Sequence, residues 1–265
     1  MKITEILNES KKPFPSIEIV PPLNGMSKDE LLGTIRSFME FAPKYINVTC
    51  HRDEYAFREE ANGTYSRHLV RNRISEVAVC AAIMSEFDVN VVPHPEGYAH
   101  ANELVEAIRR FDEQTGESFC IGVGGYPEKH FECANIETDI ENLKRKVDAG
   151  ADYIITQMFF DNKVFYRFVD LCRKAGINVP IIPGLKPIST ARQVALLPQS
   201  FSLDIPKELT EAIATAGDDK EEVYRIGTQW CAAQCKDLLA HGVPAVHFYT
   251  MGKPRNITEI MRECF

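Results

Sequence analysis

The sequence predicts an α/β fold of the (β/α)8 barrel type, and three observations carry this prediction. Short apolar, β-rich runs alternate with amphipathic segments of helical period, which is typical of a parallel sheet built from βα units. With 265 residues, the chain is long enough for one barrel-sized domain over residues 1–265. No Gly-x-Gly-x-x-Gly follows the first strand, which favours a barrel over an open doubly wound sheet.

Seven segments have the length and the β-branched or aromatic content of buried strands. They are residues 16–20, 45–49, 89–93, 119–123, 153–157, 179–183 and 245–249. A (β/α)8 barrel has eight strands, so one strand is missing from the pattern.

Between these strands, the apolar residues recur with the period of a helix. The expected helices are residues 27–41, 72–87, 99–112, 137–149, 162–175, 190–197, 221–241 and 256–264. The expected N-caps are Ser27, Asn162 and Ser189. Glycines that favour helix ends follow three of the helices, at Gly150, Gly176 and Gly242.

The composition narrows the class of partner. The net charge of −8 and the absence of a dense Lys/Arg run argue against a nucleic-acid surface, so a small-molecule partner is expected. No apolar run is long enough to cross a membrane, and the N-terminus lacks the apolar core of a signal peptide, which predicts a cytoplasmic protein. The eight cysteines form no Cys-x-x-Cys pair. Cys231 and Cys235 could share a helix face and hold a metal with a third ligand, but we expect buried small hydrophobes and no metal site.

Glu18 is the first candidate functional residue. It lies in the middle of an apolar strand, on the face that Ser16 and Val20 share, where a carboxylate would otherwise be costly. One interpretation is a carboxylate satisfied by a neighbouring donor or cation, and the other is a catalytic acid.

Polar residues and glycines gather where the predicted strands end and the following loops begin. These positions are Glu18, Thr49, His94, Gly124, Gly125, Tyr126, Gln157, Pro183, Gly184, Tyr249 and Thr250. Each has an ordinary structural explanation by itself. Because barrel active sites form at the carboxyl ends of the strands, their joint occurrence predicts a functional cleft.

Six segments in register give the chain a family resemblance. They are SIEIVPP (16–22), GYPEKH (125–130), DAGAD (148–152), TQMFFD (156–161), IPG (182–184) and HFYT (247–250). Together they resemble the signature segments of methylenetetrahydrofolate reductase, in its short bacterial form with one FAD-binding barrel. The resemblance implies that NADH or NADPH reduces FAD, which then reduces 5,10-methylenetetrahydrofolate to 5-methyltetrahydrofolate by ping-pong kinetics, in one-carbon and methionine metabolism. It also suggests a homo-oligomer.

The resemblance assigns roles residue by residue. Glu18 matches the general acid that protonates the departing folate nitrogen. The positions that match FAD contacts are Thr49, His94, His100, Ala101, Tyr126, His130, Asp139 and Lys146. The positions that match folate contacts are Gln157, Gln193, Leu197 and Lys253. His100 stands where the family usually has tyrosine, and Lys253 where it commonly has arginine, so the bidentate fork of the guanidinium is lost there.

One departure from the family follows His94. There the family continues through a further βα unit that ends in Leu-Arg-Gly-Asp, whereas this chain runs directly to Pro95. The lost unit explains the count of seven strands, and the lost Asp, Arg and Gly would contact or tune the flavin. Three alternatives to complete folate reduction therefore stay open: a flavin-binding NADH oxidoreductase without folate turnover, a non-catalytic subunit that pairs with an intact paralogue, and a zinc-dependent methyl-transfer barrel.

Overall fold

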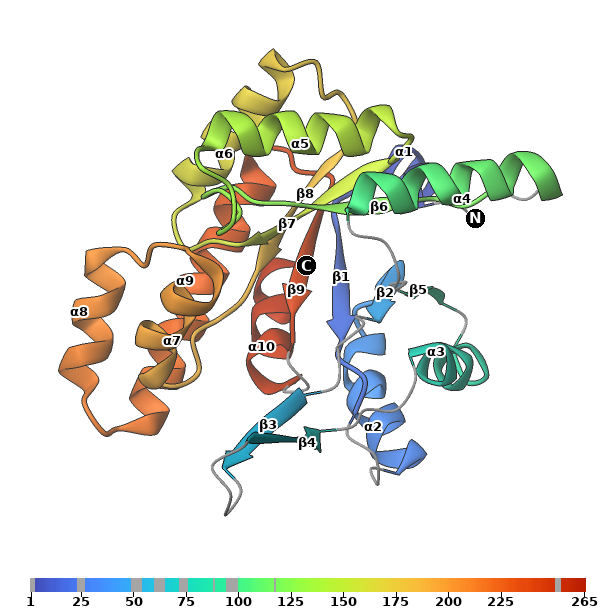
Figure 1. Cartoon of the computed structure of the whole chain (residues 1–265). Coiled ribbons are helices and arrows are strands. Elements are labelled where there is room, and N and C mark those ends of the chain that lie inside the picture. Colours follow the sequence, from blue (N-terminus) through green and yellow to red (C-terminus); the bar gives the residue numbers. More distant parts are fainter. Residues whose placement is uncertain are drawn as a thin grey trace.

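A curled parallel sheet with helices outside it forms the body of the protein (Figure 1). The structure is a computed structural model that describes residues 3–22, 27–48, 54–59, 65–71, 76–87, 89–93, 100–116, 118–250 and 254–265. Within these residues, seven parallel strands pair in the order β5-β2-β1-β9-β8-β7-β6. The sheet strands are β1 (Phe14–Ile19), β2 (Tyr45–Val48), β5 (Asn90–Pro93), β6 (Gly122–Gly125), β7 (Tyr153–Met158), β8 (Ile181–Leu185) and β9 (Ala245–Tyr249). The predicted α/β class with a barrel-type parallel sheet is confirmed.

The described helices alternate with the sheet strands along most of the chain, except that α1 precedes β1 and α7, α8 and α9 follow one another. They are α1 (Ile3–Glu9), α2 (Lys28–Met39), α3 (Glu76–Met84), α4 (Ala101–Thr115), α5 (Ile136–Asp148), α6 (Asn162–Lys174), α7 (Arg192–Phe201), α8 (Lys207–Ala216), α9 (Lys220–Ala240) and α10 (Pro254–Cys264). None of the described helices is both long and apolar enough to span a membrane.

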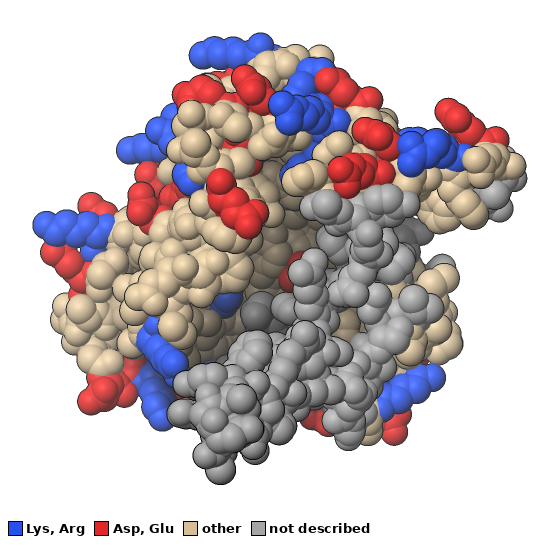
Figure 2. Space-filling model, in the orientation of Figure 1, with Lys and Arg blue, Asp and Glu red and all other residues tan. Residues whose placement is uncertain are grey.

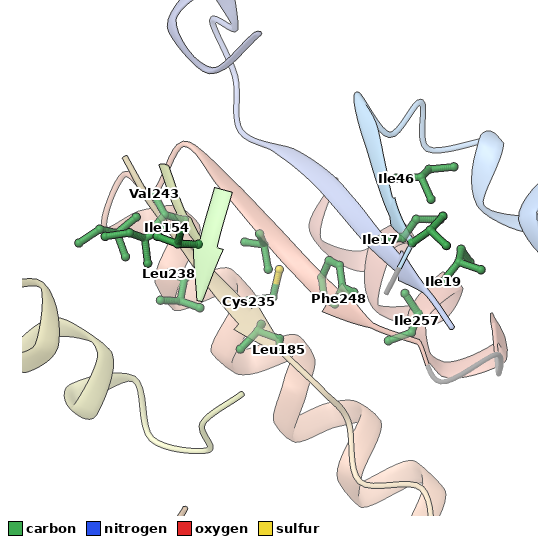
Figure 3. Close-up of a cluster of buried hydrophobic side chains, with 14 of the residues drawn as sticks. Ile17, Ile19, Ile46, Ile154, Leu185, Cys235, Leu238, Val243, Phe248 and Ile257 are labelled. Carbon is green, nitrogen blue, oxygen red and sulfur yellow. The ribbon is translucent and has the colours of Figure 1, made fainter. Parts of the chain in front are cut away.

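The main core lies between the outer face of the sheet and the surrounding helices (Figure 3). Ile17 and Ile19 alternate with the polar residues of β1, so they point into this layer and leave Glu18 on the opposite face. Figure 3 shows Phe248 of β9 and Cys235 and Leu238 of α9 in the same buried layer.

A second cluster closes the amino-terminal end of the strands. Ile3, Ile6 and Leu7 share one face of α1 and pack on Phe14, Tyr45, Tyr153, Ile182 and Ala245. The amino ends of β1, β2, β7, β8 and β9 are therefore buried by α1, which leaves their carboxyl ends for a site.

Several local predictions need correction. Asp161, not Asn162, caps α6 by accepting from the Lys163 amide, and α7 begins at Arg192, so Ser189 is no N-cap. Ser27 does cap α2, accepting from the Glu30 amide. The sequence prediction did not include α1, α8, or the antiparallel pair β3 (Glu54–Glu59) and β4 (Tyr65–Arg71).

Gly150, Gly176 and Gly242 adopt φ of 114°, 78° and 78°, as expected for residues that end helices. In this left-handed region a side chain would be strained, which explains glycine at these positions.

Candidate active site

Glu18 lies near the carboxyl end of β1, between β2 and β9. Its register partners are Asn47 and Tyr249, and only 15% of its side chain is exposed. Burial raises the pKa of Glu18 to about 7, because desolvation penalises the charged carboxylate. The carboxyl can therefore hold a proton near neutral pH, which is the property that a general acid needs.

His247 of β9 lies beside this acid. Its Nδ1 is 2.9 Å from the Ser16 hydroxyl oxygen, and its Nε2 is 4.0 Å from Oε2 of Glu18. Burial lowers the pKa of His247 to about 3, so the imidazole is neutral at neutral pH and the contact with Glu18 is not an ion pair. A neutral neighbour does not force Glu18 to ionise.

The Nε2 atom of His247 has no hydrogen-bond partner among the described residues. Its role follows from the tautomer that Ser16 selects. If the hydroxyl donates to Nδ1, Nε2 carries the proton; if Nδ1 donates, Nε2 carries a lone pair. In both tautomers an uncharged imidazole nitrogen lies 4.0 Å from the Glu18 carboxyl, close to it but not hydrogen-bonded to it.

Tyr249 and Thr250 fix the end of β9 around the acid. The Tyr249 hydroxyl donates to the Thr156 carbonyl at 2.8 Å, and the Thr250 hydroxyl donates to the Glu18 carbonyl at 2.8 Å. A Cβ on Gly184 would lie 2.2 Å from the Thr156 carbonyl oxygen, so only glycine lets β8 approach β7 this closely. These contacts hold the Glu18 backbone in place.

A second group of predicted residues gathers where β6 ends. The Lys146 ammonium donates to the Gly124 carbonyl at 3.0 Å and lies 5.8 Å from the centre of the Tyr126 ring. The His130 ring meets Tyr126 edge-on, with 4.6 Å between the ring centres. The ammonium of Lys146, the imidazole of His130 and the ring of Tyr126 therefore lie next to one another after β6. This combination suits a cofactor that has both phosphate groups and an aromatic ring system.

Asp139 has hydrogen-bond partners in the loop that follows β6. The carboxylate is buried, and its oxygens accept from the His130 amide at 2.9 Å and the Cys133 thiol at 3.3 Å. Lys129 in the same loop adopts the left-handed φ of 83°, and its ammonium donates to the Cys133 carbonyl at 2.7 Å. Asp139 thus organises the loop that carries Tyr126 and His130.

Glu128, in the segment GYPEKH, is a second partly buried acid of the site region, and nothing in the sequence singled it out. Its Oε1 accepts from the Asp204 amide at 3.1 Å, and burial raises its pKa to about 7. Its buried Oε2 has no partner among the described residues. Glu128 therefore joins the loop after β6 to the segment between α7 and α8.

The predicted folate positions have partners within the chain. Gln157, near the carboxyl end of β7, accepts from the Met158 amide at 2.9 Å through its Oε1. Oε1 of Gln193 accepts from the Ser189 and Thr190 amides, which anchors the start of α7. Leu197 of α7 is buried and packs in an apolar cluster that also contains Met158 of β7.

The remaining predicted positions are less informative. Thr49, His94 and Lys253 lie outside the described residues. His100 and Ala101 are exposed at the start of α4, where the His100 amide donates to Glu103 at 3.2 Å.

On the face shown in Figure 2, acidic and basic side chains of the described residues are interspersed, without a dense basic patch.

The fold and the site together define a barrel-type α/β protein with a proton-holding acid at the carboxyl ends of its strands. The family model described as methylenetetrahydrofolate reductase matches residues 78–264, which is more than half of the chain. The chain belongs to the methylenetetrahydrofolate reductase family.

Curated relatives carry the same name. Methylenetetrahydrofolate reductase (NADH) 1 of Arabidopsis thaliana is 38% identical over 174 residues, covering 62% of this chain and 29% of the relative. The 5,10-methylenetetrahydrofolate reductase of Escherichia coli is 38% identical over 159 residues, covering 60% of this chain and 51% of the relative. The matches thus span about half or less of these relatives.

One solved structure resembles the whole chain. It is an uncharacterized protein from Clostridium thermocellum described as binding two copies of 5-methyl-5,6,7,8-tetrahydrofolic acid, with a TM-score of 0.66 and 12% identity. The match covers 100% of this chain and 98% of that one. At this identity, the likeness supports the fold alone.

Proposed function

We propose that this protein reduces 5,10-methylenetetrahydrofolate to 5-methyltetrahydrofolate with electrons from NADH or NADPH, through bound FAD and two alternating half-reactions. The observation that carries the proposal is Glu18, an acid with a pKa of about 7 at the carboxyl ends of the strands. Family membership supplies the reaction, and the site supplies the acid that this reaction requires.

The acid is needed at one step. The carbon that accepts hydride becomes electrophilic when the five-membered ring of the folate opens, and opening requires a proton on the departing nitrogen. Glu18 donates that proton from its carboxyl group. The neutral imidazole of His247, held by Ser16, faces the resulting carboxylate without a net charge that would have ionised the acid beforehand.

FAD, when bound, supplies the carrier that takes a hydride from the nicotinamide and passes it to the folate. In this proposal Lys146 and His130 bind the pyrophosphate, and Tyr126 packs on the cofactor. Their contacts with one another support this assignment. Asp139 is proposed to act both on the ribose and as the anchor of this loop, since each carboxylate oxygen has a second lone pair.

The rest of the proposed set completes the two binding faces. Thr49, His94, His100 and Ala101 would contact FAD, and Gln157, Gln193, Leu197 and Lys253 would contact the folate. The amide nitrogen of Gln157 is the group suited to the pterin, because its Oε1 accepts from the Met158 amide, and Gln193 and Leu197 belong to the helix that would cover the substrate. The proposal includes one FAD-binding domain over residues 1–265, a homo-oligomer and a cytoplasmic location.

A second candidate is a flavin-dependent NADH oxidoreductase that no longer reduces folate. The observation that favours it is the strand order: β5 and β6 lie at the two edges of the sheet in the described part of the chain. The family's additional βα unit would stand between these two strands, so we attribute the seven-stranded sheet to its absence. The residues lost with that unit lie on the flavin side.

Anaerobic half-reactions distinguish the two candidates. The purified protein is saturated with FAD, bleached with NADH, and then mixed with methylenetetrahydrofolate. Return of the flavin absorbance supports the reductase, whereas bleaching without return supports the second candidate. Failure to bind FAD contradicts both. In the reductase, Glu18→Gln should still be bleached by NADH but lose about 10²- to 10⁴-fold in the rate of reoxidation.

A further inference from the structure

Two cysteines face each other across the helix pair α9 and α10. The thiols of Cys235 and Cys264 are hydrogen-bonded to each other. Two further contacts join the same turns: the Cys264 sulfur lies 3.7 Å from the Ala232 carbonyl oxygen, and Lys236 pairs with Glu263 at 2.6 Å. These contacts place Cys264 beside the turn of α9 that carries Cys235.

The two thiols differ in exposure and acidity. Cys235 is fully buried in the layer shown in Figure 3, whereas Cys264 is half-buried and reachable from solvent. The hydrogen bond from Cys235 has the largest influence on the pKa of Cys264 and lowers it, whereas desolvation and the Glu263 carboxylate raise it and Lys236 lowers it. Cys264 is therefore the better nucleophile, and Cys235 is the neighbouring thiol that can form a disulfide with it.

We infer that Cys264 and Cys235 form a dithiol that hydrogen peroxide oxidises to a disulfide. The Cys264 thiolate attacks the peroxide, the O–O bond breaks, and a sulfenic acid and hydroxide form. The Cys235 thiol then attacks the sulfenic sulfur, which forms the S–S bond and releases water. The two sulfur atoms together lose two electrons, and the peroxide is reduced to two waters.

Neighbouring groups do not offer a better explanation of the pair. Cys231 lies one turn earlier on α9 and is also buried, but no hydrogen bond joins it to Cys264. Within the described ranges, no group of three histidine, cysteine or acidic residues could hold a metal ion. Oxidation is thus the chemistry that fits a buried and a half-buried thiol in contact.

The disulfide would have a structural consequence near the candidate site. It would close the segment between Cys235 and Cys264, which contains β9 with His247 and Tyr249. Because a closed loop restricts the unfolded chain, the oxidised protein should have a higher melting temperature than the reduced protein.

Peptide mass spectrometry tests the proposal without any activity measurement. The full-length protein is treated with hydrogen peroxide, free thiols are alkylated, and the protein is digested with trypsin. We expect a linked pair of residues 226–236 and 263–265 that is two hydrogens lighter than the separate peptides and is released by dithiothreitol. Sulfinic acid at Cys264 without a cross-link would overturn the proposal.

Matched variants identify the sulfur atoms. Cys231 and Cys235 share one tryptic peptide, so Cys231→Ala must keep the cross-link and Cys235→Ala must lose it. Cys264→Ala, at a half-buried position, must also lose it, and Cys120→Ser is the control for a half-buried cysteine elsewhere. A cross-link that persists in Cys235→Ala would assign the bond to Cys231 and refute the pairing.

Discussion

Replacing Glu18 by glutamine should make the protein more stable, and the gain should grow with pH. The folded state raises the pKa of Glu18 from 4.5 to about 7 through burial. Below pH 4.5 the carboxyl is neutral in both the folded and the unfolded state, so its burial does not lower the free energy of unfolding through ionisation. As the pH rises from 4.5 to about 7, the unfolded state has released its proton while folded Glu18 still holds it, so stability falls; above pH 7 Glu18 is ionised in both states and the loss is complete.

The size of the effect follows from the shift. A displacement of the pKa from 4.5 to about 7 corresponds to about 3 kcal/mol at 1.36 kcal/mol per unit. Glutamine has the same shape and no charge, so Glu18→Gln should equal the wild type near pH 4.5 and exceed it by about 3 kcal/mol above pH 7. Glu128 keeps its own raised pKa in both proteins, so its contribution cancels.

Urea unfolding of the FAD-free protein between pH 4.5 and 8.5 measures this difference. The m-value should stay the same in the two proteins, because the folded structure does not change. Glu208→Gln is the matched control, since Glu208 is solvent-exposed on α8. A difference between Glu18→Gln and the wild type that does not vary with pH would refute the assignment of a buried, proton-holding carboxyl.

Three further substitutions test the neighbouring structure. Ser16→Ala removes the partner of Nδ1 in the buried His247 and should lower the free energy of unfolding by about 1–3 kcal/mol in urea titrations; an unchanged value would contradict the hydrogen bond. Gly184→Ala forces a Cβ to 2.2 Å from a backbone oxygen and should cost about 1–3 kcal/mol by the same titration, whereas Gly33→Ala, with nothing within 4 Å, should cost nothing; equal effects would contradict the close approach of β8. Lys146→Met should weaken FAD binding about tenfold or more in fluorescence titrations, and the control Lys144→Met, on the same helix but paired with Asp148, should not; equal affinities would remove Lys146 from the cofactor site.

The fold class could be predicted because the alternation of strand and helix periods is local information. The elements that escaped prediction depend on tertiary contacts. Helix α1 has 7 residues, too few for a helical period to stand out, and it is stable because Ile3 and Ile6 are buried against Phe14 and Tyr45. The start of α7 was misplaced because the Ser189 hydroxyl accepts from Asn256 of α10 and does not cap the helix, while Gln193 inside the helix accepts from the amides of Ser189 and Thr190.

The candidate acid could be predicted for a related reason. A carboxylate on the inward face of an apolar strand is anomalous by itself, so Glu18 needed no knowledge of its neighbours. The contact between Ser16 and His247 could not be found in this way, because the two residues are 231 positions apart and meet only through the pairing of β1 with β9. Both are polar residues at buried strand positions, and this was the signal available in the sequence.

The arrangement of the strands separates the two chemical tasks of the proposed reaction. Glu18, His247 and Tyr249 lie on β1 and β9, which are neighbours inside the sheet and are paired on both sides. Tyr126 and Lys146 belong to the unit that begins with β6, at one edge of the described sheet. The absence of a βα unit between β5 and β6 would therefore weaken flavin binding before it disturbs the acid. If folate reduction is slow, the concentration of added FAD is therefore the first condition to vary, before any substitution around Glu18.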